Sequence, residues 1–67
     1  MSTGIRNRLS GKIEKIVSDK VMSEILIKTA AGPVTSVITT GSVQRMNLKG
    51  DNVFAIIKAT EISVEKE

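Results

Sequence analysis

A chain of 67 residues with no Cys, no His and one aromatic residue has few means of stabilisation and little catalytic chemistry. The lack of Cys excludes disulfides and thiolate metal sites, and the lack of His removes the commonest transition-metal ligand and general base. The net charge of +3 arises from Lys and Arg scattered among Asp and Glu, a balance that favours a small anion over a polyanion as partner.

The first two predicted strands form a hairpin. Residues 9–17 carry β-branched residues in partial alternation, and Gly11 stands where a strand bulges or is closely approached. Ser18-Asp19-Lys20 has the composition of a turn, and residues 21–28 resume a strand. We therefore expect an antiparallel pair at the start of the chain.

Three further strands are predicted after this hairpin. Gly32 tolerates positive φ and Pro33 lacks an N–H, so the chain should break there before a third strand over residues 34–39. A fourth strand is expected over residues 52–60 and a short fifth over residues 62–64, followed by a charged tail that frays.

One helix of about two turns is predicted between the third and fourth strands, over residues 41–48. Val43, Met46 and Leu48 stand at helical spacing in this segment. Ser42 or Thr40 is available as its N-cap, and Gly50 as its stop.

Five strands with a helix between the third and fourth are typical of the OB-fold, a small, partly open, five-stranded Greek-key barrel of the all-β class. An SH3-like barrel is the main alternative. Residues 24–27 and 53–57 are apolar at consecutive positions, so both faces of these strands should be covered. Because only one face can point into so small a barrel, we expect a single domain over residues 1–67 that associates with copies of itself.

The sequence does not favour an enzyme. Without His or Cys, catalysis would need paired carboxylates or an activated Ser, and the acidic residues show no pairing. No Gly-rich phosphate loop is present. We find neither a signal-peptide pattern nor an apolar run near the ~20 residues that span a bilayer, so a soluble, cytoplasmic protein without membrane contact is expected.

Binding of single-stranded nucleic acid, or of a protein partner, is the competing function for an OB-fold. Nucleic-acid sites of this kind stack bases on exposed aromatic residues along a basic groove. Phe54 lies within an apolar strand and is interpreted as core rather than as a stacking platform. Weak phosphate contacts remain open to Lys12, Lys15, Lys20, Lys28, Arg45 and Lys49.

Lys58 is the most informative polar residue, because it ends the Ile56-Ile57 run of an apolar strand. A cation in that position must either extend its ammonium group to water or meet an anion. The residues alone leave these two interpretations equally open.

Three segments resemble the molbindins, the Mop family of small molybdate- and tungstate-binding proteins. Residues 5–13 resemble the family's Ala-Arg-Asn-x-Leu-x-Gly-x-Val opening. Residues 37–43 resemble its Ile-Thr-x-x-Ser-Val segment, and residues 55–62 its Ala-x-Val-Lys-Ala-Ser/Thr-x-Val segment. The three matches occur in the right order and at the right spacing over almost the whole chain.

This resemblance implies an OB-type fold, a hexamer built from three dimers, and oxyanion sites at the subunit interfaces. Thr39 and Ser42 would come from a neighbouring subunit. A second class of site near the threefold axis is assigned to Lys20 and Val21. The main ligand set implied by the resemblance is Gly4, Ile5, Arg6, Asn7, Lys58, Ala59, Thr60, Thr39 and Ser42.

Two positions depart from the family pattern: Gly4 stands where Ser is common, and Ile5 where Ala is usual. The remaining donors suit the proposed guest, because molybdate and tungstate are fully deprotonated dianions that accept hydrogen bonds and donate none. Phosphate carries a proton near neutrality and needs an acceptor. We therefore expect bound molybdate or tungstate, no catalytic cofactor, and no metal held directly by protein atoms.

Overall fold

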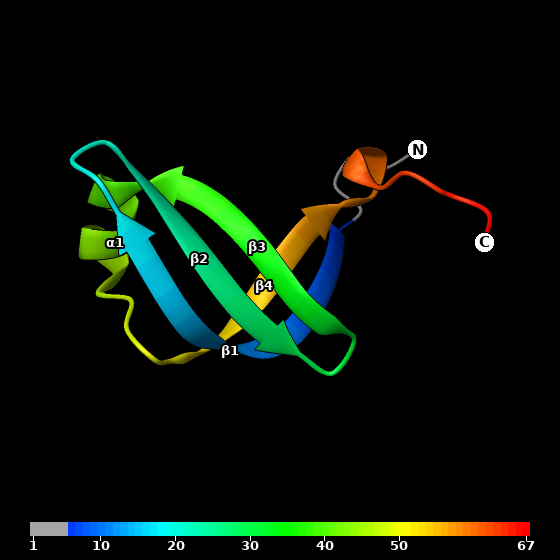
Figure 1. The fold of residues 1–67 in the computed structure, drawn as a ribbon, viewed down its shortest axis with the longest axis horizontal. Coiled ribbons are helices and arrows are strands. Elements are labelled where there is room, and N and C mark those ends of the chain that lie inside the picture. Colours follow the sequence, from blue (N-terminus) through cyan, green and yellow to red (C-terminus); the bar gives the residue numbers. More distant parts are fainter. Residues whose placement is uncertain (1–5) are drawn as a thin grey trace.

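The structure is a computed structural model that describes residues 6–67. Four antiparallel strands form one curled sheet in the order β3-β2-β1-β4 (Figure 1). The strands are β1 (Arg6–Ser18), β2 (Met22–Thr29), β3 (Gly32–Thr39) and β4 (Asn52–Lys58). The helix α1 (Thr40–Met46) follows β3, and the single 3-10 turn η1 (Ala59–Glu61) follows β4. The predicted all-β, OB-like architecture with one short helix after the third strand is confirmed.

The predicted fifth strand is wrong. Residues 62–67 have no regular secondary structure, and the side chain of Val64 is 96% exposed. The fourth strand stops at Lys58 rather than at residue 60, because η1 turns the chain away from the sheet and Ile62 N–H closes that turn on the Ala59 carbonyl at 3.4 Å. No strand pairs with residues 62–64 in the described part of the chain, and a strand needs a hydrogen-bonded partner to form a ladder.

The helix begins and ends at residues other than those predicted. Thr39, not Thr40 or Ser42, is the N-cap, and its hydroxyl accepts the Ser42 N–H. The helix stops at Asn47, which adopts a left-handed conformation with φ of 53° and donates its N–H to the last carbonyls, rather than at Gly50. Asn is one of the few residues besides Gly that adopts this conformation readily.

The first strand is long because it pairs with two different partners. Its first half pairs with β4 and its second half with β2, with a bulge between Ile13 and Lys15. The close approach predicted at Gly11 is confirmed, since a Cβ there would lie 2.7 Å from Cγ2 of Ile27 and 2.9 Å from the Lys28 carbonyl oxygen. The expected break at Gly32 is a turn with φ of 113°, and Pro33 lies within β3, at the edge of the sheet.

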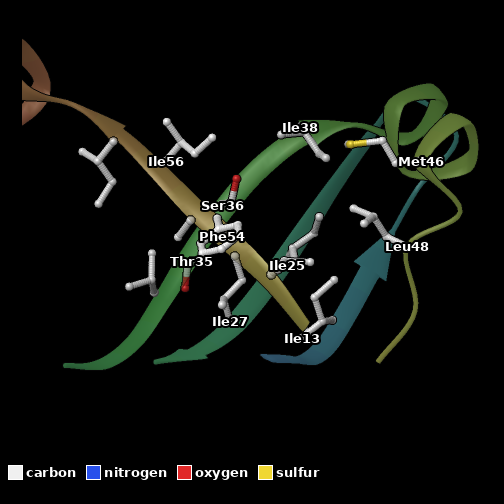
Figure 2. Close-up of a pocket in the computed structure, with 14 residues that line it drawn as sticks. Ile13, Ile25, Ile27, Thr35, Ser36, Ile38, Met46, Leu48, Phe54 and Ile56 are labelled. Atoms are coloured by element: carbon white, nitrogen blue, oxygen red, sulfur yellow. The ribbon is translucent and has the colours of Figure 1, made fainter. Parts of the chain in front are cut away.

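The core lies on the concave face of the sheet, where Ile13, Ile25, Ile27 and Ala55 are buried. Because β3 and β4 do not pair, this face opens as a groove of about 500 Å³ between them (Figure 2). The prediction that Phe54 is a core residue is wrong, since its side chain is 55% exposed. Alternation along β4 turns Ala55 inward and leaves Phe54 on the other face, where its ring meets Arg8.

Candidate functional site

Two predicted site cations stand directly opposite each other where β1 begins and β4 ends. Arg6 is the register partner of Lys58, and both side chains are exposed. Directly opposed residues of an antiparallel pair share one face, with Cβ atoms about 4.5–5.5 Å apart. Because opposed like charges repel, this arrangement is unfavourable without an anion and becomes favourable when a dianion lies between the two cations.

The same stretch of β1 offers backbone donors. Residues 6–10 pair with β4 on one side only, because pairing with β2 starts at Gly11. Within the described part of the chain, the other edge of this stretch carries no strand, so N–H groups that point outward there can reach a ligand. Asn7 follows Arg6 in the strand, so its side chain lies on the opposite face, and a contact with the same anion would have to come from its backbone.

Ala59 and Thr60 extend this cationic end. Both residues are exposed and belong to η1, the turn that directly follows Lys58 in the chain. The Thr60 hydroxyl therefore lies in that turn. Gly4 and Ile5, the remaining members predicted for this group, lie outside the described residues. The structure thus brings Arg6, Lys58, Ala59 and Thr60 to one end of the sheet.

The predicted hydroxyl donors form a second group at the start of α1. The hydroxyls of Thr39 and Ser42 are 2.7 Å apart, and Arg45 Nη2 donates to Ser42 Oγ at 3.1 Å. The two hydroxyl groups carry one hydrogen each, and the hydrogen bond between them uses one of these hydrogens, whichever residue is the donor. One O–H therefore remains to donate to an external acceptor, and the Arg45 charge polarises the pair in that direction.

The two groups lie at opposite ends of the molecule. In Figure 1, α1 occupies one end of the long axis and η1 the other, and the molecule extends 35 Å along that axis. A tetrahedral oxyanion contacts groups within a few ångströms of one another, so a single copy cannot offer Lys58 and Thr39 to the same ion. Each group is therefore only a part of the predicted ligand set.

The predicted second-site residues lie at the helix end as well. Lys20 and Val21 are exposed in the turn between β1 and β2, and the Val21 carbonyl accepts the Thr40 N–H at 2.8 Å. The Asp19 carboxylate in this turn accepts the N–H groups of Met22 and Val21, both at 2.8 Å. These two hydrogen bonds stabilise the charged carboxylate and lower the pKa of Asp19 below its usual value.

A chain of hydroxyls ties this turn to the helix. Ser23 is buried, and its Oγ lies 2.6 Å from Ser18 Oγ and 2.8 Å from Thr40 Oγ1. Thr40 in turn donates its hydroxyl to the Asp19 carbonyl at 2.8 Å. The segment that carries Thr39 is therefore held in place by hydrogen bonds that need no ligand.

The concave groove is an unsuitable place for an oxyanion. Its lining is aliphatic apart from Met46, Thr35, Ser36 and Phe54, which belongs to the strand β4 that borders the groove, and no cation lies along it (Figure 2). Moving a dianion into such surroundings without charged partners is costly. Residues 6–67 also lack any group of three His, Cys, Asp or Glu side chains that could hold a metal ion. The same part of the chain contains no helix long and apolar enough to cross a bilayer.

Sequence reasoning gave Arg45 only a weak phosphate contact and missed its place beside Ser42. The available signal was its spacing, because residues three apart on a helix are neighbours. Arg8 was missed too. Its guanidinium carbon lies 4.1 Å from the centre of the Phe54 ring, a contact between strands that the sequence shows only once the register of β1 and β4 is known.

Comparison with known proteins places these features in a family. Residues 3–64 match the TOBE domain family. Molybdenum-pterin-binding protein 3 of Clostridium pasteurianum is 33% identical over 66 residues, which cover 96% of this chain and 97% of that protein. Molybdenum-pterin-binding protein 1 of the same organism is 32% identical over the same shares of both chains.

Two solved structures share the fold. A molybdate-binding protein from Sporomusa ovata superposes with a TM-score of 0.88 at 36% identity, and MopII from Clostridium pasteurianum with a TM-score of 0.85 at 28% identity. Each comparison covers 98% of both chains. The resemblance to the molbindins is confirmed, and the chain belongs to the TOBE domain family.

Proposed function

We propose that this protein binds molybdate or tungstate at interfaces between its copies and serves as an intracellular store of the oxyanion. The observation that carries the proposal is the pair of opposed cations, Arg6 and Lys58, together with a hydroxyl pair that has one O–H to donate. The relatives named as molybdenum-pterin-binding and molybdate-binding proteins support the same guest.

The chemistry of the two groups favours an unprotonated dianion. Arg6, Lys58, Thr39, Ser42 and Thr60 supply charged or hydroxyl donors, and none of them is a carboxylate. Molybdate and tungstate accept hydrogen bonds at every oxygen, so a site made of donors satisfies them completely. A protonated phosphate would leave its own O–H without an acceptor, and sulfate, whose oxygens lie closer to its centre, would fit a larger cavity poorly.

Because the two groups lie at opposite ends of one copy, a complete site needs a second copy, and a hexamer is the assembly that the resemblance to the molbindins implies. Arg6, Asn7, Lys58, Ala59 and Thr60 would serve from one copy, as would Gly4 and Ile5, which lie outside the described residues. Thr39 and Ser42 would serve from a neighbouring copy. We propose a hexamer, arranged as a trimer of dimers, in which Lys20 and Val21 contribute to a second class of site.

In this proposal the protein is a single cytoplasmic domain that binds and releases an anion without catalysis and without a catalytic cofactor. Bound oxyanion stabilises the assembly by mass action, because it binds the folded oligomer and not the unfolded chain.

Equilibrium binding tests the proposal directly. Purified protein is analysed for molybdenum and tungsten, then titrated with molybdate, tungstate, sulfate and a single-stranded oligonucleotide, with mass measured by light scattering. We expect tight binding of the first two anions, weak binding of sulfate, and a melting temperature that rises with molybdate. A melting temperature unmoved by excess molybdate and tungstate, or a strictly monomeric mass, would contradict the proposal.

Single-stranded nucleic acid is the second candidate, and one observation favours it. Phe54 is exposed rather than buried, beside Arg8 on a face that also carries Arg6 and Lys58. Arg8 already covers one side of the ring, which leaves less of it for base stacking. Oligonucleotide binding stronger than molybdate binding in the titration would favour this function instead.

A further inference from the structure

The convex face of the sheet carries an apolar surface flanked by cations at the end where β4 finishes. Phe54 and Ile56 are 55% and 57% exposed there. Arg8 is the register partner of Ile56, and Arg6 that of Lys58, so all five side chains share this face. We name these five residues the cationic patch. Phe54 and Ile56 are neighbours on this face of β4, and adjacent exposed apolar side chains favour a surface that another molecule covers.

The opposite end of the same face carries a second apolar surface, flanked by acids. Val17 and Val37 are 54% and 60% exposed and stand on either side of Glu24 in register, and Met22 is 40% exposed beside them. With Asp19 they line a shallow hollow of about 260 Å³. We name Val17, Asp19, Met22, Glu24 and Val37 the acidic patch.

We infer that the acidic patch of one copy docks on the cationic patch of the next copy. Glu24 then faces Arg8, and the two valines cover Phe54 and Ile56. This contact deepens the proposed function, on which it rests in part, by stating which surfaces bring the two halves of the oxyanion site together.

Charge favours a second copy as the occupant. Arg6 and Lys58 are left for the oxyanion, so Arg8 is the cation of the cationic patch that is free to face Glu24 of the acidic patch. Two cationic patches, or two acidic patches, would repel each other.

The docked arrangement also completes the anion site. Met22 of the acidic patch is the register partner of Thr39, and Ile56 of the cationic patch lies two residues before Lys58. Docking therefore carries the Thr39–Ser42 hydroxyl pair of one copy towards the Arg6–Lys58 pair of the next.

Because the two patches differ, the contact is head-to-tail. Repetition of a head-to-tail contact closes into a ring or continues as a filament. A closed ring of three copies is the arrangement that agrees with the proposed trimer of dimers.

A charge exchange tests the contact. The variants Glu24→Arg, Arg8→Glu and the double variant are prepared, with Lys28→Glu as a matched reversal on the same face but outside both patches. Neither Glu24 nor Arg8 belongs to the proposed ligand set, so each variant keeps its own anion-binding groups. Mass is measured by light scattering and native mass spectrometry over a dilution series without added oxyanion, and molybdate binding is measured in parallel.

We expect each single reversal in a patch to weaken the assembly about 100-fold, the double variant to recover most of this loss, and Lys28→Glu to keep the wild-type mass. Single reversals that retain the wild-type mass overturn the contact, as does a double variant no better than the singles. Loss of oligonucleotide binding in Arg8→Glu at unchanged mass also overturns it, and assigns the cationic patch to nucleic acid.

The two proposals fail separately. If the wild-type protein binds molybdate but the charge reversals in the patches leave the mass unchanged, the proposed function is supported and this contact is contradicted. If the wild-type protein does not bind molybdate but the double variant recovers the assembly, the contact between copies is supported and the oxyanion site is contradicted.

Discussion

The two ends of the molecule are organised by different forces. At the helix end, hydroxyls of Ser18, Ser23 and Thr40 bond to one another and to the backbone, so the segment carrying Thr39 is fixed before any ligand arrives. At the cationic end, the register places Arg6 against Lys58, an arrangement that gains from a ligand. One end is therefore preorganised, and the other is poised for charge neutralisation.

The largest expected effect is the loss of anion affinity in Lys58→Ala. Removing a charged hydrogen-bond donor costs about 1.5–3 kcal/mol, which corresponds to roughly 10- to 150-fold weaker molybdate binding. The unfolding free energy of the ligand-free protein should stay the same or rise, because an opposed like-charge pair is removed. Calorimetric titration and urea unfolding measure the two quantities.

Lys28→Ala is the matched control for this prediction. Lys28 is opposed to Lys12 in register, so it shares the like-charge setting without belonging to the ligand set. The unfolding free energy of Lys28→Ala should change in the same direction as that of Lys58→Ala, whereas its affinity for molybdate should equal that of the wild type. Equal losses of affinity in both variants would mean that overall charge, not the local site, attracts the anion.

An intermediate effect is expected from Thr40→Val at the helix end. The substitution keeps the shape of the side chain but removes the hydroxyl that joins Ser23 to the Asp19 carbonyl. Loss of these hydrogen bonds beside a buried hydroxyl should lower the unfolding free energy by about 1–2 kcal/mol. Urea unfolding measures the loss, and Thr40→Ser, which retains the hydroxyl, should recover most of it. Equal destabilisation in both variants would show that packing rather than hydrogen bonding holds this end.

The smallest effect is a pH dependence from Asp19. Its pKa in the folded protein is lowered below 3.8 by the N–H groups of Met22 and Val21, so the charged carboxylate stabilises the fold above that pH and the contribution disappears as pH falls through the folded value. Asp19→Asn retains an acceptor oxygen without the charge. The wild type should be slightly more stable than this variant near neutrality, and the difference should vanish in acid. Unfolding curves that differ equally at all pH values would contradict the charge argument.

Much of the fold could be predicted because local pattern and packing agree in the first two strands. The alternation in residues 9–17 and the turn at residues 18–20 predicted the hairpin, and Gly11 predicted the close approach that the structure shows beside Ile27 and Lys28. The fifth strand failed for a tertiary reason. Residues 62–64 have the composition of a strand, but a strand forms only where another strand pairs with it, and composition does not report such pairing.

The candidate site was predicted in part. The resemblance of the motifs supplied the residues of both groups as a prediction, but the placement of Arg6 and Lys58 as direct opposites depends on the register, which no single segment encodes. The exposure of Phe54 was missed for the same kind of reason. A run of consecutive apolar residues predicts a strand that is buried on both faces. In this copy only the face of β4 that carries Ala55 packs against the core, and the face that carries Phe54 is exposed.

The separation of the two groups along the long axis has a consequence for the proposed binding. In one isolated copy the Arg6–Lys58 pair and the Thr39–Ser42 pair are too far apart to hold the same ion. Under the proposed assembly, complete sites therefore form only when copies associate, and the anion bound per chain rises with protein concentration.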